Sequence, residues 1–560
     1  MRLLTSPVRG LHAAVYILAT FAVLSSLLAL LRDRLFAHYL GAGSELDIYY
    51  AAFRIPDLLF VAIGSLVSVY ILIPELSRRE GEERRHYIDT IVVGFSLLAV
   101  VLAGVAAFFA PQLLALLFPQ FGSAGHIELL TALTRIMLLQ PILLGLSNIL
   151  AALTQSAHRY VLYSISPVLY NLGIIAGLVV FYPYIGLAGL AWGVILGAVL
   201  HLGIQVPTIV GEGYFRSLPR LWDMGALLRT AVISVPRALT LSMNQLAFLG
   251  LTVLAGTLSA GSISVFMFAF NLVSVPLSII GASYSVAAFP TLAAALSRGR
   301  RDEFIEYVGI AARYILFWSL PATALIIVLR AHVVRVILGS GAFDWTDTRL
   351  TAAVFAVLSI ALATQGLTLL LARAYYAAGR TFVPFFIATF SAFGTLLMGI
   401  GLLYAFNEPD VMRFVQRLLR LENVAGASVL ALAISYAFMS ILATLALIAH
   451  FHYRFEAFFK YIAATLWQAL LASFVAGSLA YLVLTILGPV TLFSTLLSVF
   501  LKGFTAGVVG IAGAALVYTI SRSREYGETV TALRARLWKE PAPGTPPLSS
   551  AEEIGSSSLQ

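Results

Sequence analysis

The chain has 560 residues, of which 60% are hydrophobic and only 11% are charged, and its mean hydropathy is +0.95. Soluble globular domains carry about 25% charged residues, so these values exclude a soluble enzyme and a disordered chain. The net charge of +9 would suit nucleic-acid binding or basic loops held on the cytoplasmic side of a membrane. The hydropathy favours the second interpretation, and we expect no nucleic-acid partner.

Apolar runs follow one another along almost the whole chain. A transmembrane helix needs about 20 mostly apolar residues, and the first run is too long for the core of a cleaved signal peptide. We therefore expect an all-α polytopic membrane protein. The boundaries of the apolar runs predict fourteen transmembrane helices, over residues 11–39, 48–77, 87–110, 127–154, 160–181, 185–207, 226–256, 263–294, 304–338, 349–377, 382–406, 424–449, 459–487 and 491–521.

Lysine and arginine occur in alternate loops. The loops near residues 78–85, 159, 216–220, 298–301, 380, 454–460 and 522–524 are basic. The loops at 41–47, 111–126, 182–184, 257–262, 339–348 and 488–490 contain no lysine or arginine. Because basic loops stay on the cytoplasmic side, we expect both termini in the cytoplasm.

One outer loop does not follow this rule. Residues 407–423 carry Arg413, Arg417 and Arg420 at helical spacing, with apolar residues between them. Such a pattern predicts a short amphipathic helix. It is compatible with a helix lying on the outer membrane surface and equally with a helix packed against the bundle.

Two sets of residues recur at a nearly constant separation, which indicates an internal repeat. The set Pro74-Glu75-Leu76 with Arg84-Arg85 recurs 216 residues later as Pro290-Thr291-Leu292 with Arg300-Arg301. The set Gly145-Leu146 with Arg159 recurs 221 residues later as Gly366-Leu367 with Arg380. Six spans in each repeat suit two parallel lobes that rock around a central cavity. We expect lobes over residues 1–207 and 208–451, a helix pair over 452–522, and a partly disordered cytosolic tail over 523–560.

Charged residues within the membrane are costly and usually face a wet cavity or each other. The first hairpin is the richest in them, with Arg32, Asp33, Asp47, Arg54 and Asp57. An arginine fork binds phosphate oxygens in a bidentate manner, so this hairpin predicts a cavity for an anionic headgroup. The alternative is that Arg32 pairs locally with Asp33 and Arg54 with Asp57, or that these side chains extend to the membrane interface.

Asparagine and glutamine side chains in other spans, among them Asn171, Asn244, Gln245 and Asn271, are expected to join helices by hydrogen bonds. The sequence has no phosphate-binding loop and no motif of a metalloprotease or serine hydrolase. We therefore expect no catalytic residue, no metal site and no cofactor. The energy would come from the membrane potential, a monovalent ion gradient or the gradient of the substrate.

The first hairpin resembles that of the MurJ/MviN lipid II flippases, a family of the multidrug/oligosaccharidyl-lipid/polysaccharide exporter superfamily. The resemblance rests on Leu31-Arg32-Asp33-Arg34-Leu35-Phe36-Ala37, on Gly41-Ala42-Gly43 and on the segment from Asp47 to Leu59. It continues through Ile73-Pro74-Glu75-Leu76, Phe289-Pro290-Thr291-Leu292 and Gly341-Ala342-Phe343. It implies fourteen helices, arranged as two six-helix lobes and a final pair, around a central cationic cavity.

The resemblance also implies a substrate-binding role for four residues. These are Arg32 and Asp33 in helix 1, Asp47 at the start of helix 2, and Arg54 before the proline of helix 2. The chain departs from the family pattern elsewhere, because expected arginines are replaced by Ser26, Phe60 and Asn271, and an expected glutamate by Ser65.

The function implied by the resemblance is transport, not enzymatic catalysis. The chain would move a polyprenyl-diphosphate-linked cell-wall precursor, lipid II in the first place, across the bacterial cytoplasmic membrane by alternating access for peptidoglycan synthesis. Its expected partners are this anionic lipid-linked sugar, membrane lipids and cell-wall synthesis proteins. Two alternatives stay open: an exporter of another lipid-linked oligosaccharide or of cationic drugs, and a membrane scaffold that does not transport.

Overall fold

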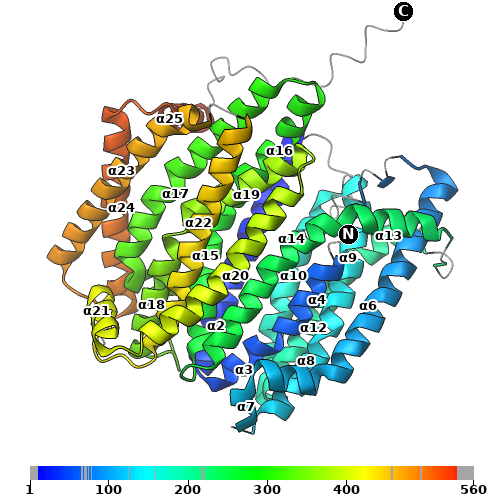
Figure 1. Cartoon of the computed structure of the whole chain (residues 1–560), viewed down its shortest axis with the longest axis horizontal. Helices are drawn as coiled ribbons and strands as arrows, with labels where there is room; N and C mark the ends of the chain where they lie inside the picture. Colours follow the sequence, from blue (N-terminus) through cyan, green and yellow to red (C-terminus); the bar gives the residue numbers. More distant parts are fainter. Residues whose placement is uncertain are drawn as a thin grey trace, which may run out of the picture.

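The computed structural model describes residues 11–538, except residues 65–66, 68–71, 74, 77, 124, 158, 216–218, 221, 456–457 and 492–494. Ser65 and the tail beyond Trp538 lie outside the described residues, and so do the predictions made for them. The regular secondary structure of the described residues is all helical, without a strand, and the all-α prediction is confirmed (Figure 1).

We call the helices α2 to α13 the N-half. They are α2 (Leu11–Leu40), α3 (Ser44–Ala52), α4 (Arg54–Gly64), α6 (Gly81–Leu117), α7 (Pro119–Ser123), α8 (Ile127–Met137), α9 (Leu139–Ser156), α10 (Tyr160–Ala176), α11 (Tyr182–Ile185), α12 (Leu187–Gly203) and α13 (Val206–Gly211). A π-helical turn over Gly177–Phe181 joins α10 to α11.

We call the helices α14 to α22 the C-half. They are α14 (Met224–Gly256), α15 (Ser262–Pro276), α16 (Ser283–Ser297), α17 (Arg301–Ile337), α18 (Trp345–Ser359), α19 (Leu362–Ala377), α20 (Phe382–Ala405), α21 (Pro409–Leu419) and α22 (Leu430–Phe455). Three helices follow: α23 (Phe458–Leu487), α24 (Leu496–Ile520) and α25 (Arg524–Trp538).

The order of helices in the N-half returns in the C-half. Helices α6 and α17 are both 37 residues long, carry two acidic residues in the first turn and contain one internal proline. In each half the next span is broken in two, as α8 and α9 or as α18 and α19. Acidic residues at a helix N-terminus are favoured by the helix dipole, so the two long helices begin for the same reason.

The predicted count of fourteen spans is not confirmed. Among the described residues, ten helices are long and apolar enough to cross a membrane, or eleven if α18 and α19, bent by 45°, form one span. The second predicted span is divided into α3 and α4 and then enters residues outside the description, and α12 is a shorter apolar helix of 17 residues. The chain is nonetheless a multi-pass membrane protein.

The first helix of each half also contacts helices of the other half. Helix α2 packs on α10 and also contacts α15 and α17, whereas α14 packs on α20 and also contacts α4 and α6 (Figure 1). Helices α23 and α24 pack on each other and along α17. Glycines allow close approach within the N-half. A Cβ on Gly173 of α10, or on Gly177 in the π-helical turn that follows it, would overlap the backbone of Gly197 or Gly193 of α12.

Helix α21 combines both interpretations of the 407–423 loop. Met412, Val415 and Leu419 pack against the hydrophobic core. Phe414 and Leu418, 66% and 67% exposed, form an apolar stripe on the outside. The helix is therefore attached to the bundle by one stripe and leaves a second one uncovered.

Candidate functional site

The two halves meet in a seam near Gly41, and we call this end of the bundle the Gly41 end. Asp47 of the N-half is 4% exposed and reaches the first turn of α15 in the C-half. Its carboxylate accepts hydrogen bonds from the backbone N–H groups of Gly261 and Ser264, both at 2.7 Å, and from the Ser264 hydroxyl at 2.6 Å. These groups are donors that a helix N-terminus leaves unpaired, so Asp47 caps a helix of the opposite half.

Arg34 makes the complementary contact at the same end. Its Nη1 donates to the carbonyl oxygens of Val336 at 2.6 Å and Ile337 at 3.2 Å, in the last turn of α17. A helix C-terminus carries partial negative charge and leaves carbonyls unpaired. The N-half thus places an acid at a helix start and an arginine at a helix end of the C-half.

Backbone packs on backbone along this seam. The N–H of Ala342 donates to the carbonyl of His38 at 2.9 Å. Gly41 and Gly341 both have positive φ, and a Cβ on Gly41 would lie 2.7 Å from the carbonyl oxygen of Ala342. Gly261, with φ of 88°, has no room for a Cβ because the carbonyl of Ala42 lies against it. Glycine suits these positions because it adopts positive φ without strain and has no Cβ to collide with the opposite backbone.

Arg32 and Asp33 form a second layer of contacts between the halves. Arg32 donates from Nη2 to Asp33 at 2.9 Å and from Nη1 to Asn171 of α10 at 3.2 Å. The second oxygen of Asp33 accepts from the amide of Asn271 in α15 at 3.0 Å. Asn171 and Asn271 therefore join helices as predicted. An arginine was expected at position 271, and the neutral amide of Asn271 donates the hydrogen bond to Asp33 instead.

Arg54 is the N-half cation that borders a cavity. It is 3% exposed and lies 3.4 Å from Asp57, its Nε donates to the carbonyl of Tyr50, and its guanidinium lies 5.0 Å from the ring centre of Phe248 in α14. Its Nη1 has no hydrogen-bond partner among the described residues. A buried, unpaired charged donor is costly, and a ligand oxygen would relieve this cost.

The cavity has a volume of about 600 Å³ and is enclosed mostly by the C-half. Its N-half wall consists of Arg54 and Asp57 from α4, and the other walls come from α14, α15, α19, α20 and α22. Arg373 of α19 is the third charged residue in the described lining. Sequence reasoning missed Arg373, because a single arginine near the end of an apolar run gives no sign of which way it faces.

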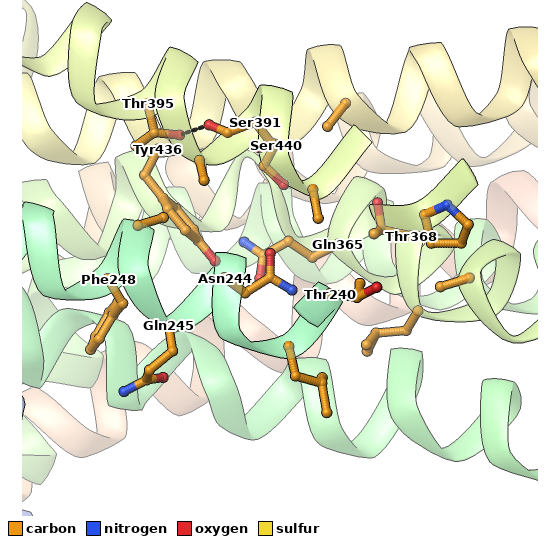
Figure 2. A pocket seen from close by; sticks show the side chains of 18 of the residues that line it. Thr240, Asn244, Gln245, Phe248, Gln365, Thr368, Ser391, Thr395, Tyr436 and Ser440 are labelled. Carbon is orange, nitrogen blue, oxygen red and sulfur yellow. Dashed lines mark hydrogen bonds between the residues drawn. The ribbon is translucent and has the colours of Figure 1, made fainter. Parts of the chain in front are cut away.

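Neutral polar side chains cover much of the C-half wall (Figure 2). They are Thr240, Asn244, Gln245, Gln365, Thr368, Ser391, Thr395, Tyr436 and Ser440. The prediction that Asn244 joins two helices is wrong, because its amide faces the cavity without a hydrogen bond to another described residue.

Of the four predicted site residues, Arg54 alone lines this cavity. Arg32 and Asp33 lie next to it and are linked to its lining through Asn271. Asp47 lies in the seam. The replaced positions Ser26 and Phe60 are both half-buried, and Ser26 donates to the carbonyl of Ala22 in its own helix.

Three arginines gather at the opposite end of the bundle, which we call the Arg380 end. Arg301, Arg380 and Arg454 line one pocket of about 370 Å³, and they come from three of the loops that are basic in the sequence. Helix α17 runs from this pocket to the seam. Its 37 residues cover about 55 Å at 1.5 Å per residue, so the two ends lie on opposite sides of a bilayer.

Comparison with known proteins identifies the family. The family model described as "Lipid II flippase MurJ" matches residues 36–502, which is most of the chain. The chain belongs to the MurJ family.

Curated relatives agree with this membership. The chain is 27% identical over 397 residues to a probable lipid II flippase MurJ of Buchnera aphidicola (subsp. Acyrthosiphon pisum), which covers 70% of the chain and 78% of that protein. It is 24% identical over 385 residues to the lipid II flippase MurJ of Burkholderia cenocepacia, covering 66% of the chain and 73% of that protein.

Solved structures show the same fold. A lipid II flippase MurJ in an inward closed conformation superposes with a TM-score of 0.70 at 21% identity, over 92% of the chain and all of that protein. A multidrug resistance MATE family transporter of the MOP superfamily, in an inward-facing conformation, superposes with a TM-score of 0.62 at 15% identity, over 78% of the chain and 96% of that protein. The fold is thus shared with transporters of two kinds.

Proposed function

We propose that the protein is a flippase of the bacterial cytoplasmic membrane. It carries lipid II, a polyprenyl-diphosphate-linked precursor of peptidoglycan, from the inner to the outer leaflet by alternating access. Family membership supports the substrate. The single structural observation that carries the proposal is a cavity between the halves, bordered by a buried arginine with an open donor and closed at one end by a seam.

The orientation follows from the distribution of charge. The Arg380 end collects basic loops and would face the cytoplasm, so the seam would face the outside. With the seam closed, substrate would enter from the cytoplasmic side, and release to the outer leaflet would require Asp47 and Arg34 to leave the helix ends of the C-half.

The site residues take different roles in this proposal. Arg54 contacts the diphosphate, because its unpaired Nη1 borders the cavity and an arginine keeps its charge when buried. Arg32 is a second candidate contact once its bonds to Asp33 and Asn171 rearrange. Asp33 and Asp47 act by holding the halves together, through Asn271 and through Gly261 and Ser264. The movement would draw on the membrane potential or on a monovalent ion gradient, without a cofactor.

The charges of the cavity disfavour a carrier of cationic drugs. The described lining holds two arginines and one aspartate, so an organic cation would meet net positive charge at low dielectric. A non-transporting scaffold has no need of a buried arginine with an open donor, whose cost no partner offsets. An exporter of another lipid-linked oligosaccharide would use the same groups, and the experiment below separates it from a lipid II flippase.

The test uses a bacterial strain depleted of its own lipid II flippase. We expect the wild-type chain to restore growth and the Arg54→Gln variant to fail at equal expression. Arg135→Gln is the matched control, since this exposed arginine of α8 donates to the carbonyl of Ala107 at 2.9 Å and does not line the cavity among the described residues. Full activity of Arg54→Gln would overturn the site. Failure of a well-expressed wild-type chain, together with no binding of purified lipid II, would overturn the substrate.

A further inference from the structure

Three polar side chains of the C-half point into one part of the cavity without a partner. Figure 2 shows the amides of Asn244 and Gln365 and the hydroxyl of Tyr436 directed toward the same space. They come from α14, α19 and α22, three helices far apart in the chain. Within the part of the chain that the structure describes, none of these side chains has a hydrogen-bond partner.

Helix packing does not account for these groups. Amides inside a membrane bundle normally bond across helices, as Asn171 and Asn271 do here. These polar groups are accessible within the cavity, so a ligand that displaces water from this wall must replace the hydrogen bonds of that water. Three of them on one wall, from three helices, therefore indicate a polar ligand.

A chain of ring contacts connects this wall to the cation of the cavity. The guanidinium of Arg54 lies over Phe248, Phe248 lies 4.6 Å from Phe270 between ring centres, and Phe270 meets the ring of Tyr436 edge-on at 5.8 Å. The Tyr436 ring is thereby held in place, with its hydroxyl open to the cavity. A ligand bound at the wall would thus lie a few side chains away from a diphosphate on Arg54.

The chemistry of the wall selects the kind of ligand. An amide offers both donors and an acceptor, and a phenol can donate and accept. Ser391 and Ser440 add hydroxyl groups to the same lining. Sugar hydroxyls and acetamido groups likewise donate and accept without carrying charge, whereas phosphate oxygens require donors only. The volume of about 600 Å³ lies within the range of cavities that enclose small ligands.

We propose that Asn244, Gln365 and Tyr436 form a saccharide subsite, which binds the sugar of the lipid-linked substrate while Arg54 binds its diphosphate. This inference rests on the proposed function. It adds that the C-half recognises the sugar and the N-half the diphosphate, so one substrate bridges the two halves.

The experiment measures binding of three lipids to the purified full-length protein in detergent. They are bare undecaprenyl diphosphate, the same lipid carrying the disaccharide without the peptide, and lipid II. We expect the wild type to bind the disaccharide lipid at least about tenfold more tightly than the bare lipid, since a site built to bond hydroxyls discriminates against a ligand that lacks them. Lipid II should bind at least as tightly as the disaccharide lipid.

Variants test whether Asn244, Gln365 and Tyr436 cause the gain in affinity that the disaccharide gives. The Asn244→Leu/Gln365→Leu double variant should bind the bare lipid as the wild type does and should lose most of the gain from the disaccharide. Tyr436→Phe, which keeps the ring against Phe270, should lose a smaller part. Gln245→Leu is the matched control on the same helix, because Figure 2 shows its amide directed away from the other two, and it should retain the gain.

Other binding results would contradict the proposals. A wild type that binds the three lipids with equal affinity overturns the saccharide subsite and leaves the diphosphate site intact. A double variant that loses bare-lipid binding to the same extent, or a Gln245→Leu variant that loses the gain, also overturns it. A disaccharide lipid no better than the bare lipid, with lipid II much better, shows that the peptide is recognised and overturns it too. No binding of any lipid instead overturns the proposed function.

Discussion

The carboxylate of Asp47 and the backbone N–H of Gly261 lie 2.7 Å apart and join the two halves, although the two residues are 214 positions apart in the chain. Asp47 lies in the first turn of α3, whereas Gly261 stands directly before the first residue of α15. A side chain of one half therefore completes a helix of the other. This contact lies beside buried apolar side chains of both halves, among them Tyr50 and Phe268, and adds charge-assisted hydrogen bonds that hold the halves in one register.

Substitution Asp47→Asn should loosen the seam. It removes the charge from a carboxylate that accepts three hydrogen bonds, and hydrogen bonds to charged groups contribute about 1.5–3 kcal/mol each. The chain has no cysteine, so Ser262→Cys, at a position 1% exposed beside the seam, provides a single reporter. We expect Asp47→Asn to raise its labelling by a membrane-impermeant maleimide about tenfold or more.

Glu45→Gln is the control for that measurement. Glu45 belongs to the same hairpin but accepts from Tyr182 within the N-half at 2.9 Å, so labelling of the reporter should stay at the level of the parent. Equal labelling in the Asp47 and Glu45 variants would show that the carboxylate of Asp47 does not hold the seam.

Substitution Gly261→Ala should open the same end by a steric route. Gly261 has φ of 88° and lies against the carbonyl of Ala42, so a methyl group adds a clash to the backbone strain. Gly299→Ala separates the two effects, because Gly299 also has positive φ, 72°, but a Cβ there meets no atom within 4 Å. Positive φ alone costs a non-glycine residue about 1–2 kcal/mol. Gly261→Ala should lower the thermal midpoint more than Gly299→Ala and should alone increase maleimide labelling at residue 262.

Substitution Glu525→Gln should detach the end of the chain from the C-half. Glu525 is 3% exposed, forms an ion pair with Arg313 of α17 at 2.9 Å and accepts hydrogen bonds from Thr465 and Ser523. Removing one charge of a buried pair typically costs about 3–5 kcal/mol. We expect a clear fall in the thermal midpoint and faster proteolysis within α25. Glu528→Gln, at an exposed pair, should change the midpoint little, and equal effects of the two variants would contradict the role of burial.

Acid should loosen the contact between α25 and α17 through Glu528. Partial burial raises the pKa of Glu528, but hydrogen bonds from Tyr314 and Arg524 outweigh this effect and hold the pKa below its ordinary value. A carboxylate with a lowered pKa in the folded state stabilises that state at neutral pH, and the contribution is lost as the pH falls through the folded pKa. The protection factors of α25 in hydrogen exchange, corrected for the intrinsic rate at each pH, should therefore fall below about pH 4.5. The Glu528→Gln variant lacks the titrating carboxyl, so it should show only slightly lower protection of α25 than the wild type at pH 7 and a weaker loss of protection in acid.

Much of the helical framework could be predicted, because it depends on local patterns. The order of apolar runs indicates the helices. Of the recurring sets, the arginine pairs stand at the starts of the two 37-residue helices α6 and α17, and the Gly-Leu pairs lie in α9 and α19. The spacing of Gly173 and Gly177 marks a helix face that can approach another closely, and the structure brings that face against α12. The number of spans was not confirmed, because a break such as the one between α3 and α4, and a short helix such as α12, leave the apolar pattern of the sequence unchanged.

The site depended on contacts that no local pattern contains. Arg54 was predicted as a cavity residue, but the same sequence pattern gave Asp47 the same role, and its partners lie in the other half. Asn171 and Asn244 look alike in sequence, as single amides in apolar helices. One bonds Arg32 and the other faces the cavity, and the rotation of each helix within the bundle makes the difference.

The sequence by itself thus determined that this is a helical membrane protein with a repeated order of helices and basic loops on alternate sides, because hydropathy and charge act residue by residue along the chain. Tertiary structure alone decided which polar side chains meet. Asp47 caps a helix and Asn244 faces the cavity because of how helices more than 70 residues apart pack together. Hydrogen bonds form only within about 3 Å, so this packing decides which polar groups can bond.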